Sequence, residues 1–328
     1  MSTYWMVMAG SALACFGLMA ARGKRYQLAG STAPLFFILA VPMALLAGRG
    51  MYFLCSLDWI IDRGVSFLQF DEGHFMLYGT LLGGAAAACA AGRMTGRPAA
   101  SVLDAAACSA ALMIAAERFS EYLIGMGYGV GIEEWFDPWG EWSMIAWENP
   151  EYLCRFPFGM QNYYGTWRFA VNLPEGLWAL TIAGILLKSR PRKKGGETVM
   201  MLLLYAAGQI LLETLRRDEV MKWSFVQVNQ LLSALILAGI LLLCWRMQPA
   251  TERHRKKLLI SLGLMLLLAG IVMLMEFALD QKIAFLFWMK ADLSYLTDLA
   301  CCAGMAFLVL PIWRKAFPII SPEGRGPI

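Results

Sequence analysis

The sequence predicts an all-α polytopic membrane protein with about nine transmembrane helices. Hydrophobic residues make up 59% of the 328 residues and the mean hydropathy is +0.56, values typical of a chain that crosses a bilayer many times. Basic residues gather in alternate loops between the apolar segments. Segments of roughly 20 apolar residues, long enough to span the hydrocarbon core, begin near Tyr4, Ala33, Phe75, Ser101, Gly176, Val199, Val226, Leu258 and Tyr295.

The basic residues predict the orientation, because cytoplasmic loops of membrane proteins carry an excess of Lys and Arg. The chain has 28 such residues and a net charge of +4. With the N-terminus outside and the C-terminus inside, 18 of them lie on the inner side: Arg22, Lys24, Arg25, Arg93, Arg97, Lys188, Arg190, Arg192, Lys193, Lys194, Arg246, Arg253, Arg255, Lys256, Lys257, Arg314, Lys315 and Arg325. The positive charge is therefore a topology signal, and no nucleic-acid partner is expected.

The helical segments at the start of the chain have distinct features. No basic residue precedes the first segment and Arg22 to Arg25 follow it, which favours an uncleaved N-out anchor over a signal peptide. The third segment carries Gly79, Gly83, Gly84 and an alanine run at 85–88, so it is expected to pack closely on another helix.

The longest loop, from about 126 to 173, separates the fourth and fifth crossings. It is rich in Trp, Tyr and acidic residues, a composition that suits the level of the lipid headgroups. We interpret it as a small extracytoplasmic head; an aromatic belt without a ligand-binding role is an equal alternative. Residues 1–257 are predicted to form the transmembrane core. Residues 258–328 are predicted to add a C-terminal helix pair and a cytoplasmic tail, because the last two crossings carry almost no intramembrane charge.

Metal and cofactor chemistry is not expected. His74 and His254 are the only histidines, which excludes a multi-histidine metal site. The eight Cys show no metal-ligand spacing, and seven lie in or beside apolar segments, where Cys usually behaves as a small hydrophobic residue.

Arg118 is the first candidate for the functional site, since an ionisable residue at membrane depth is costly. Glu121 lies three residues further on, within reach of Arg118 on a helix. Asp104 lies fourteen residues earlier, within about 40° of the same helix face but about 21 Å away along the axis. Gly129 follows in a glycine-rich stretch where backbone can approach a ligand. The functional interpretation is an anion site; the alternative is an interfacial Arg that snorkels or pairs with Glu121.

A second polar cluster ends the sixth crossing. Gln209 lies one helical turn before Glu213, and Glu213 can reach Arg216 at the i+3 position. This end of the sixth crossing is expected on the same side as Arg118. Two guanidinium groups converging there would suit a lipid phosphate, which they bind in bidentate fashion. The alternative is an ordinary juxtamembrane charge cluster.

The start of the third crossing supplies a candidate acid or base. His74 lies one helical turn before Tyr78, and histidine titrates near neutral pH. A lone histidine near a helix start is more often a capping or interface residue, so that alternative stays open.

Together these motifs resemble the prolipoprotein diacylglyceryl transferase family between about Arg49 and Ser233. The stretch from Ala116 to Gly129 is similar to the family signature Gly-Arg-x-x-Asn-Phe-x-Asn-x-Glu-x-x-Gly, with Arg118 and Gly129 matching, and Asp104 matches an Asp upstream of it. Further similar motifs are Gly48-Arg49 with Met51-Tyr52, Tyr78-Gly79-Thr80-Leu81-Leu82-Gly83, Asn172-Leu173-Pro174-Glu175, Tyr205 to Arg216, and Asn229-Gln230-Leu231-Leu232-Ser233.

The departures from the family pattern fall on important positions. Tyr78 stands where the family has a His, Gln209 where it has an Arg, and Glu121 where it has an Asn. The family also has seven crossings. Arg118 and Arg216 are kept, together with the acidic residues Glu175 and Glu213.

The resemblance implies a transferase in a bacterial plasma membrane that moves diacylglyceryl from phosphatidylglycerol to the lipobox Cys thiol of a prolipoprotein. It implies no metal and no cofactor. The expected catalytic residues are Tyr78, Arg118, Glu213 and His74, and the residues expected at the lipid phosphate are Arg118, Arg216, Gln209, Glu121, Gly129, Asp104 and Glu175. The alternative is an inactive relative that binds phospholipid or a partner.

Overall fold

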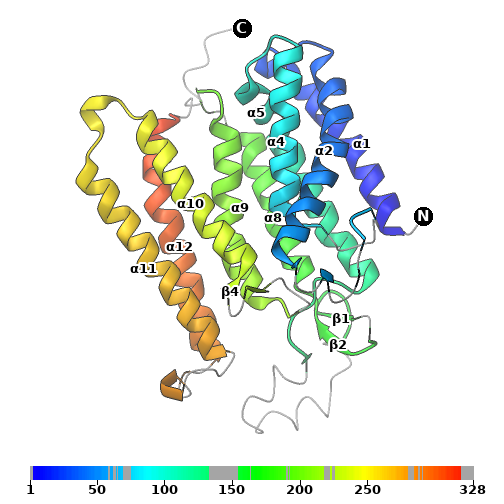
Figure 1. Cartoon of the computed structure of the whole chain (residues 1–328), viewed down its shortest axis with the longest axis vertical. Helices are drawn as coiled ribbons and strands as arrows, with labels where there is room; N and C mark the ends of the chain where they lie inside the picture. The colour runs from blue at the N-terminus through cyan, green and yellow to red at the C-terminus, as the bar shows by residue number, and fades with distance from the viewer. Residues whose placement is uncertain are drawn as a thin grey trace.

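The computed structural model is an all-α bundle with small strands at one end (Figure 1). It describes residues 3–57, 60–61, 64, 66–68, 75–132, 154–162, 164–189, 191, 193–217, 222–223, 226–279, 284–286, 289 and 291–318. The long helices within these ranges are α1 (Thr3–Gly23), α2 (Thr32–Cys55), α4 (Leu77–Met94), α5 (Ala99–Glu121), α8 (Asn172–Lys188), α9 (Gly196–Leu215), α10 (Val228–Met247), α11 (Arg255–Leu279) and α12 (Ala291–Ala316).

These helices coincide with the predicted apolar segments, and the polytopic membrane class is confirmed. In the described part of the chain, seven helices are long and apolar enough to cross a membrane: α1, α2, α5, α9, α10, α11 and α12. Helix α8 has only 17 residues, and α4 has 18 that include several Gly and Ala. The count of nine crossings and the N-out orientation stay predictions.

The small-residue face of α4 packs directly on the backbone of α2. A Cβ added at Gly79 would lie 2.6 Å from the carbonyl oxygen of Ala47, and one at Gly83 would collide with the carbonyl of Met43. Such close approach needs glycine on one partner. The close packing expected from these glycines is confirmed.

One end of the bundle, which we call the distal end, is held together by charged residues on α1, α5 and α9. Glu197, in the first turn of α9, accepts hydrogen bonds from Arg22 at 2.5 Å and Arg25 at 2.6 Å. Asp104, near the start of α5, accepts bonds from the backbone of Gly195 at 2.6 Å and Thr198 at 3.0 Å. Buried carboxylates are stable there because each has charged or backbone partners.

The opposite end, the strand end, carries the described part of the predicted head. Strand β1 (Gly159–Gln161) pairs antiparallel with β2 (Trp167–Phe169), with Gly159 opposite Phe169. Strands β3 (Lys222–Trp223) and β4 (Val226–Gln227) form a second short hairpin before α10. Residues 133–153, which include most of the Trp and acidic residues of the loop, lie outside the described residues.

The C-terminal helices α11 and α12 share a hydrophobic core with α9 and α10. Leu203, Leu237, Met265 and Met305, one from each of the four helices, are all buried in it. At the distal end, the indole N–H of Trp313 donates to the carbonyl oxygen of Gly196 at 3.3 Å. Helix α12 is thus anchored to the first residue of α9.

Candidate functional site

Five predicted site residues meet at the strand end, where α5 and α9 end and α8 begins. Arg118 and Glu121 come from the last turn of α5, Glu175 from the first turn of α8, and Glu213 and Arg216 from the end of α9. Four of the five are buried, with Arg118 6% exposed and Glu175 2% exposed, and Arg216 is partly buried. Local spacing explains the pairing within α5, whereas the helix packing brings Glu175 and Arg216 to it.

Arg118, Glu121, Glu175 and Arg216 form a closed ring of ion pairs, which we call the arginine–carboxylate cluster. Arg118 Nη1 donates to Glu121 Oε1 at 2.6 Å, and Arg118 Nε lies 3.0 Å from Glu175 Oε2. Arg216 Nη1 donates to the same Glu175 oxygen at 3.0 Å, and its Nη2 lies 3.5 Å from Glu121 Oε1. Each guanidinium therefore contacts both carboxylates.

Carboxylates outnumber guanidiniums around the cluster. Glu117 adds a third carboxylate 3.5 Å from Arg118 Nε. Two further oxygens, Glu121 Oε2 and Glu175 Oε1, are buried and accept no hydrogen bond within the described part of the chain. Buried polar atoms are normally paired, so these two oxygens are free to accept hydrogen bonds from a ligand or water. An anionic ligand would have to replace carboxylates around the two guanidiniums.

Glu213 belongs to a neighbouring group of polar side chains. It accepts hydrogen bonds from Gln209 Nε2 at 2.7 Å and from Asn229 Nδ2 at 3.0 Å. Gln209 belongs to the segment that the sequence placed on the side of Arg118, and it donates its amide N–H to Glu213. The Gln209 carbonyl oxygen is buried and has no hydrogen-bond partner among the described residues.

Tyr78 joins this group through Ser233 of α10. The two hydroxyls share a hydrogen bond of 2.5 Å, and Ser233 also donates to the carbonyl oxygen of Asn229 at 2.7 Å. The ring of Tyr78 packs edge-on against Tyr205, with centroids 6.1 Å apart. Tyr78 and Glu213 are therefore both connected to the first two turns of α10.

Two other predicted site residues do not join the cluster, and a third cannot be placed. Asp104 is at the distal end, bonded to the start of α9, because fourteen residues of helix separate it from Arg118 even though both lie toward one face. Gly129 packs against backbone instead: a Cβ there would lie 2.9 Å from the carbonyl oxygen of Leu215. His74 lies outside the described residues.

Asn229, Ser233 and Gly127 contact the site but were not predicted as site residues. The Asn229 to Ser233 motif pointed to the two α10 residues only as part of a resemblance. Gly127 has a φ of +73°, and an added Cβ would lie 2.6 Å from Glu121 Oε2. A glycine just after a charged helix end was the available signal, because this backbone region strongly favours glycine.

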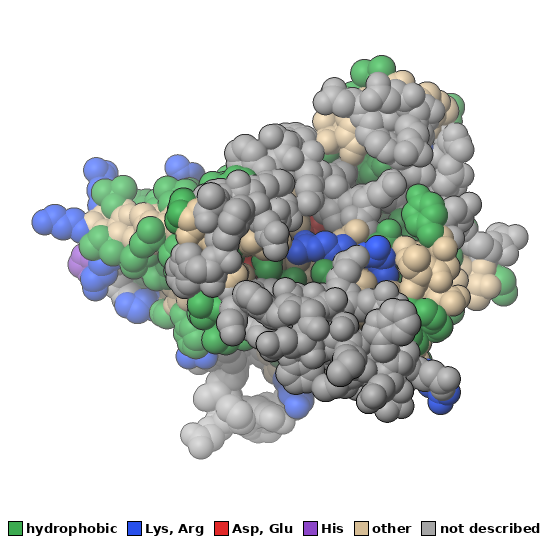
Figure 2. Space-filling view, turned by 90° about the horizontal axis from the view of Figure 1, so that it is seen from below, with side chains coloured by type: hydrophobic (Ala, Val, Ile, Leu, Met, Phe, Trp, Pro, Cys, Tyr) green, Lys and Arg blue, Asp and Glu red, His purple; other side chains and the backbone are tan. Residues whose placement is uncertain are grey.

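Seen from the strand end, Lys and Arg side chains lie together in the middle of the molecular face (Figure 2). Arg216 and Arg217 follow α9 directly at this end, and both are partly buried. Basic side chains at this surface would attract anionic headgroups.

Comparisons with known proteins give the same relationship over most of the chain. A family model described as prolipoprotein diacylglyceryl transferase matches residues 1–245. A phosphatidylglycerol–prolipoprotein diacylglyceryl transferase of Symbiobacterium thermophilum is 30% identical over 66% of this chain and 78% of its own length. Proteins of the same name are 27% identical in Streptococcus suis, over 66% of this chain and 77% of theirs, and 26% identical in Halalkalibacterium halodurans, over 67% and 74%.

Proposed function

The chain belongs to the prolipoprotein diacylglyceryl transferase family, and from this premise we propose that it is a phosphatidylglycerol–prolipoprotein diacylglyceryl transferase. The acceptor is the lipobox Cys thiol of a prolipoprotein. The names of the relatives support this function over an inactive lipid-binding protein. The membrane is proposed to be the bacterial plasma membrane, with the strand end on the outer side.

The structural observation that carries the proposal is the pair of arginines, Arg118 and Arg216, held together in the arginine–carboxylate cluster. In the reaction, the Cys sulfur forms a bond to the glyceryl carbon, the bond from that carbon to the phosphate oxygen breaks, and glycerol phosphate leaves. The leaving phosphate gains negative charge. Arg118 and Arg216, fixed by their carboxylate partners, are suited to stabilise that charge in a site of low dielectric constant.

Binding of the lipid phosphate requires an exchange of partners in the cluster. The phosphate takes positions now held by Glu121 and Glu175 on the two guanidiniums. A carboxylate released in this way can accept the proton of the Cys thiol, which must be lost because the thiolate is the nucleophile. Tyr78 is assigned as a hydrogen-bond donor, since a phenol hydroxyl keeps its proton at neutral pH and can donate it in a hydrogen bond.

The direct test uses the purified full-length protein in vesicles containing phosphatidylglycerol. A synthetic prolipoprotein signal peptide with its lipobox Cys should gain the mass of one diacylglyceryl group, attached through a thioether. A Cys→Ala peptide should gain nothing. If the Cys peptide stays unmodified while the protein is folded in the vesicles, the proposal is wrong.

A further inference from the structure

The first two turns of α10 contact three other helices through three polar side chains. Asn229 donates to Glu213 of α9 at 3.0 Å, and Ser233 is hydrogen-bonded to Tyr78 of α4. Gln230, between them in sequence, contacts α11 instead. Any shift of this part of α10 would therefore move the hydrogen-bond partners of Glu213 and Tyr78 together.

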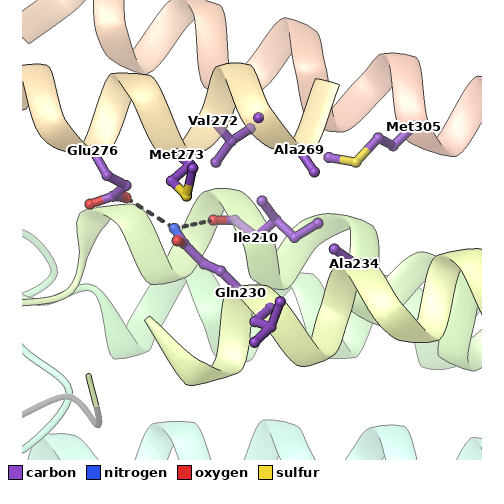
Figure 3. Close-up of a pocket in the computed structure, with 10 residues that line it drawn as sticks. Ile210, Gln230, Ala234, Ala269, Val272, Met273, Glu276 and Met305 are labelled. Atoms are coloured by element: carbon purple, nitrogen blue, oxygen red, sulfur yellow. Dashed lines mark hydrogen bonds between the residues drawn. The ribbon is translucent and has the colours of Figure 1, made fainter. Parts of the chain in front are cut away.

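Gln230 is held by a buried acid of α11. Its Nε2 atom lies 3.0 Å from Glu276 Oε1 and 3.2 Å from the carbonyl oxygen of Ile210 (Figure 3). The same atom lies 2.9 Å from Thr214 Oγ1. An amide nitrogen carries two hydrogens, and a carboxylate is the strongest of these acceptors. Glu276 is 6% exposed and also lies 3.5 Å from Gln227 Nε2, just before α10.

Packing alone does not fix Gln230. Beside it lies a cavity of about 190 Å³ lined mainly by apolar side chains of α9, α10, α11 and α12. Small residues, Ala234, Ala269 and Gly270, form part of this lining. The amide therefore has space to move on that side, and its hydrogen bonds are what hold it in place.

We propose that Glu276 is a positioning residue for the transferase site. Through Gln230 it fixes the first two turns of α10, which orient Glu213 through Asn229 and Tyr78 through Ser233. This inference rests on the proposed function. It gives a role in the reaction to helix α11, which lies beyond the family-matched residues 1–245.

The test compares Glu276→Leu, Glu276→Gln and Met265→Ala in the full-length protein. Met265 is buried on α11 away from the polar contacts, so its truncation loosens the same helix without touching Gln230. We expect Glu276→Leu to lower kcat about tenfold to a hundredfold, as for small misplacements of reacting groups, with KM for phosphatidylglycerol within about twofold. Glu276→Gln should keep most of kcat, because its amide oxygen still accepts from Gln230, and Met265→Ala should keep kcat.

A second measurement does not depend on activity. Hydrogen exchange of the backbone amides at 229–233 should speed up in Glu276→Leu and stay near wild type in Met265→Ala. If Glu276→Leu does not accumulate in the membrane, Gln230→Met breaks the same contact from the other side and should show the same exchange. An inactive wild-type protein would refute the proposed function but would leave the hydrogen-exchange test of Glu276 unaffected. Unchanged exchange, or equal loss of kcat in Glu276→Leu and Met265→Ala, would overturn the role of Glu276.

Discussion

Arg118→Ala should both destabilise the protein and inactivate it. The change leaves Glu121 and Glu175 buried without the guanidinium that lies 2.6 Å and 3.0 Å from them. Breaking a buried ion pair by removing one partner costs roughly 3–5 kcal/mol. Arg216 still lies 3.0 Å from Glu175 and 3.5 Å from Glu121, so we expect the free energy of unfolding to fall by an amount at the lower end, about 3 kcal/mol.

The effect on the reaction is separate from the effect on stability. Loss of one preorganised donor to the developing phosphate charge should lower kcat about a hundredfold to a thousandfold. Adding Glu121→Gln to Arg118→Ala removes one of the uncompensated carboxylates, so the double variant should recover part of the lost stability. It should recover no activity, because the Arg118 guanidinium that binds the phosphate is still missing.

Thermal unfolding in detergent and lipidation of the signal peptide in vesicles measure the two effects. Arg93→Ala is the matched control, since Arg93 is an exposed basic residue in the last turn of α4 at the distal end; it should behave as wild type in both assays. If Arg118→Ala keeps kcat within tenfold of wild type, or if Glu121→Gln restores activity to it, Arg118 is not the phosphate ligand.

Three further outcomes are expected. Gly127→Ala should lower the free energy of unfolding by about 1–3 kcal/mol and lower activity, because the added Cβ meets both a positive φ and a clash with Glu121. The control is Gly165→Ala, which has a similar φ of +76° but open space around it, and it should lose less stability and keep full activity. Equal losses of stability in the two variants would show that the clash with Glu121 has no effect. Tyr78→Phe should lower kcat at least about tenfold, as expected for loss of a catalytic group, while the unfolding temperature changes little; unchanged lipidation kinetics would remove Tyr78 from the site. Asp104→Ala should lower the free energy of unfolding by about 1–3 kcal/mol, because the hydrogen bonds of Asp104 to the start of α9 are lost. Activity per folded molecule should be retained. A raised KM for phosphatidylglycerol at wild-type stability would instead indicate that Asp104 contributes to the lipid-binding site.

Interactions along one helix could be predicted from the sequence. The Arg118–Glu121 pair follows from their spacing on α5, and the close packing of α4 follows from its glycines. Helix periodicity also placed Asp104 on the same face of α5 as Arg118. It could not predict that the Asp104 carboxylate binds the start of α9, because that contact depends on how the helices pack. Its partners, Gly195 and Thr198, are 91 and 94 residues away in the chain.

The sequence placed Arg118 and Arg216 at the same end of the bundle, but it could not give the individual contacts between helices. Glu175 meets Arg216 across 41 residues, and no spacing rule connects them. Glu276 was missed because it lies near the end of an otherwise apolar segment, where a single acid is indistinguishable from an ordinary interface residue. Its partner Gln230 lies 46 residues earlier, so only the packing of α11 on α10 makes the contact visible.

The attachment of α12 to α9 bears on how the protein matures in the cell. Chains are made from the N-terminus, so residues 118, 175 and 216 enter the membrane before Glu276 and Trp313 exist. A nascent chain that has reached residue 245 already holds every member of the arginine–carboxylate cluster, yet it has no acid for Gln230 and no indole for Gly196. The last two helices therefore complete the contacts of α9 and α10 only at the end of synthesis. If Glu276 positions α10 as proposed, hydrogen exchange in the first two turns of α10 would differ between the complete chain and one that stops at residue 245.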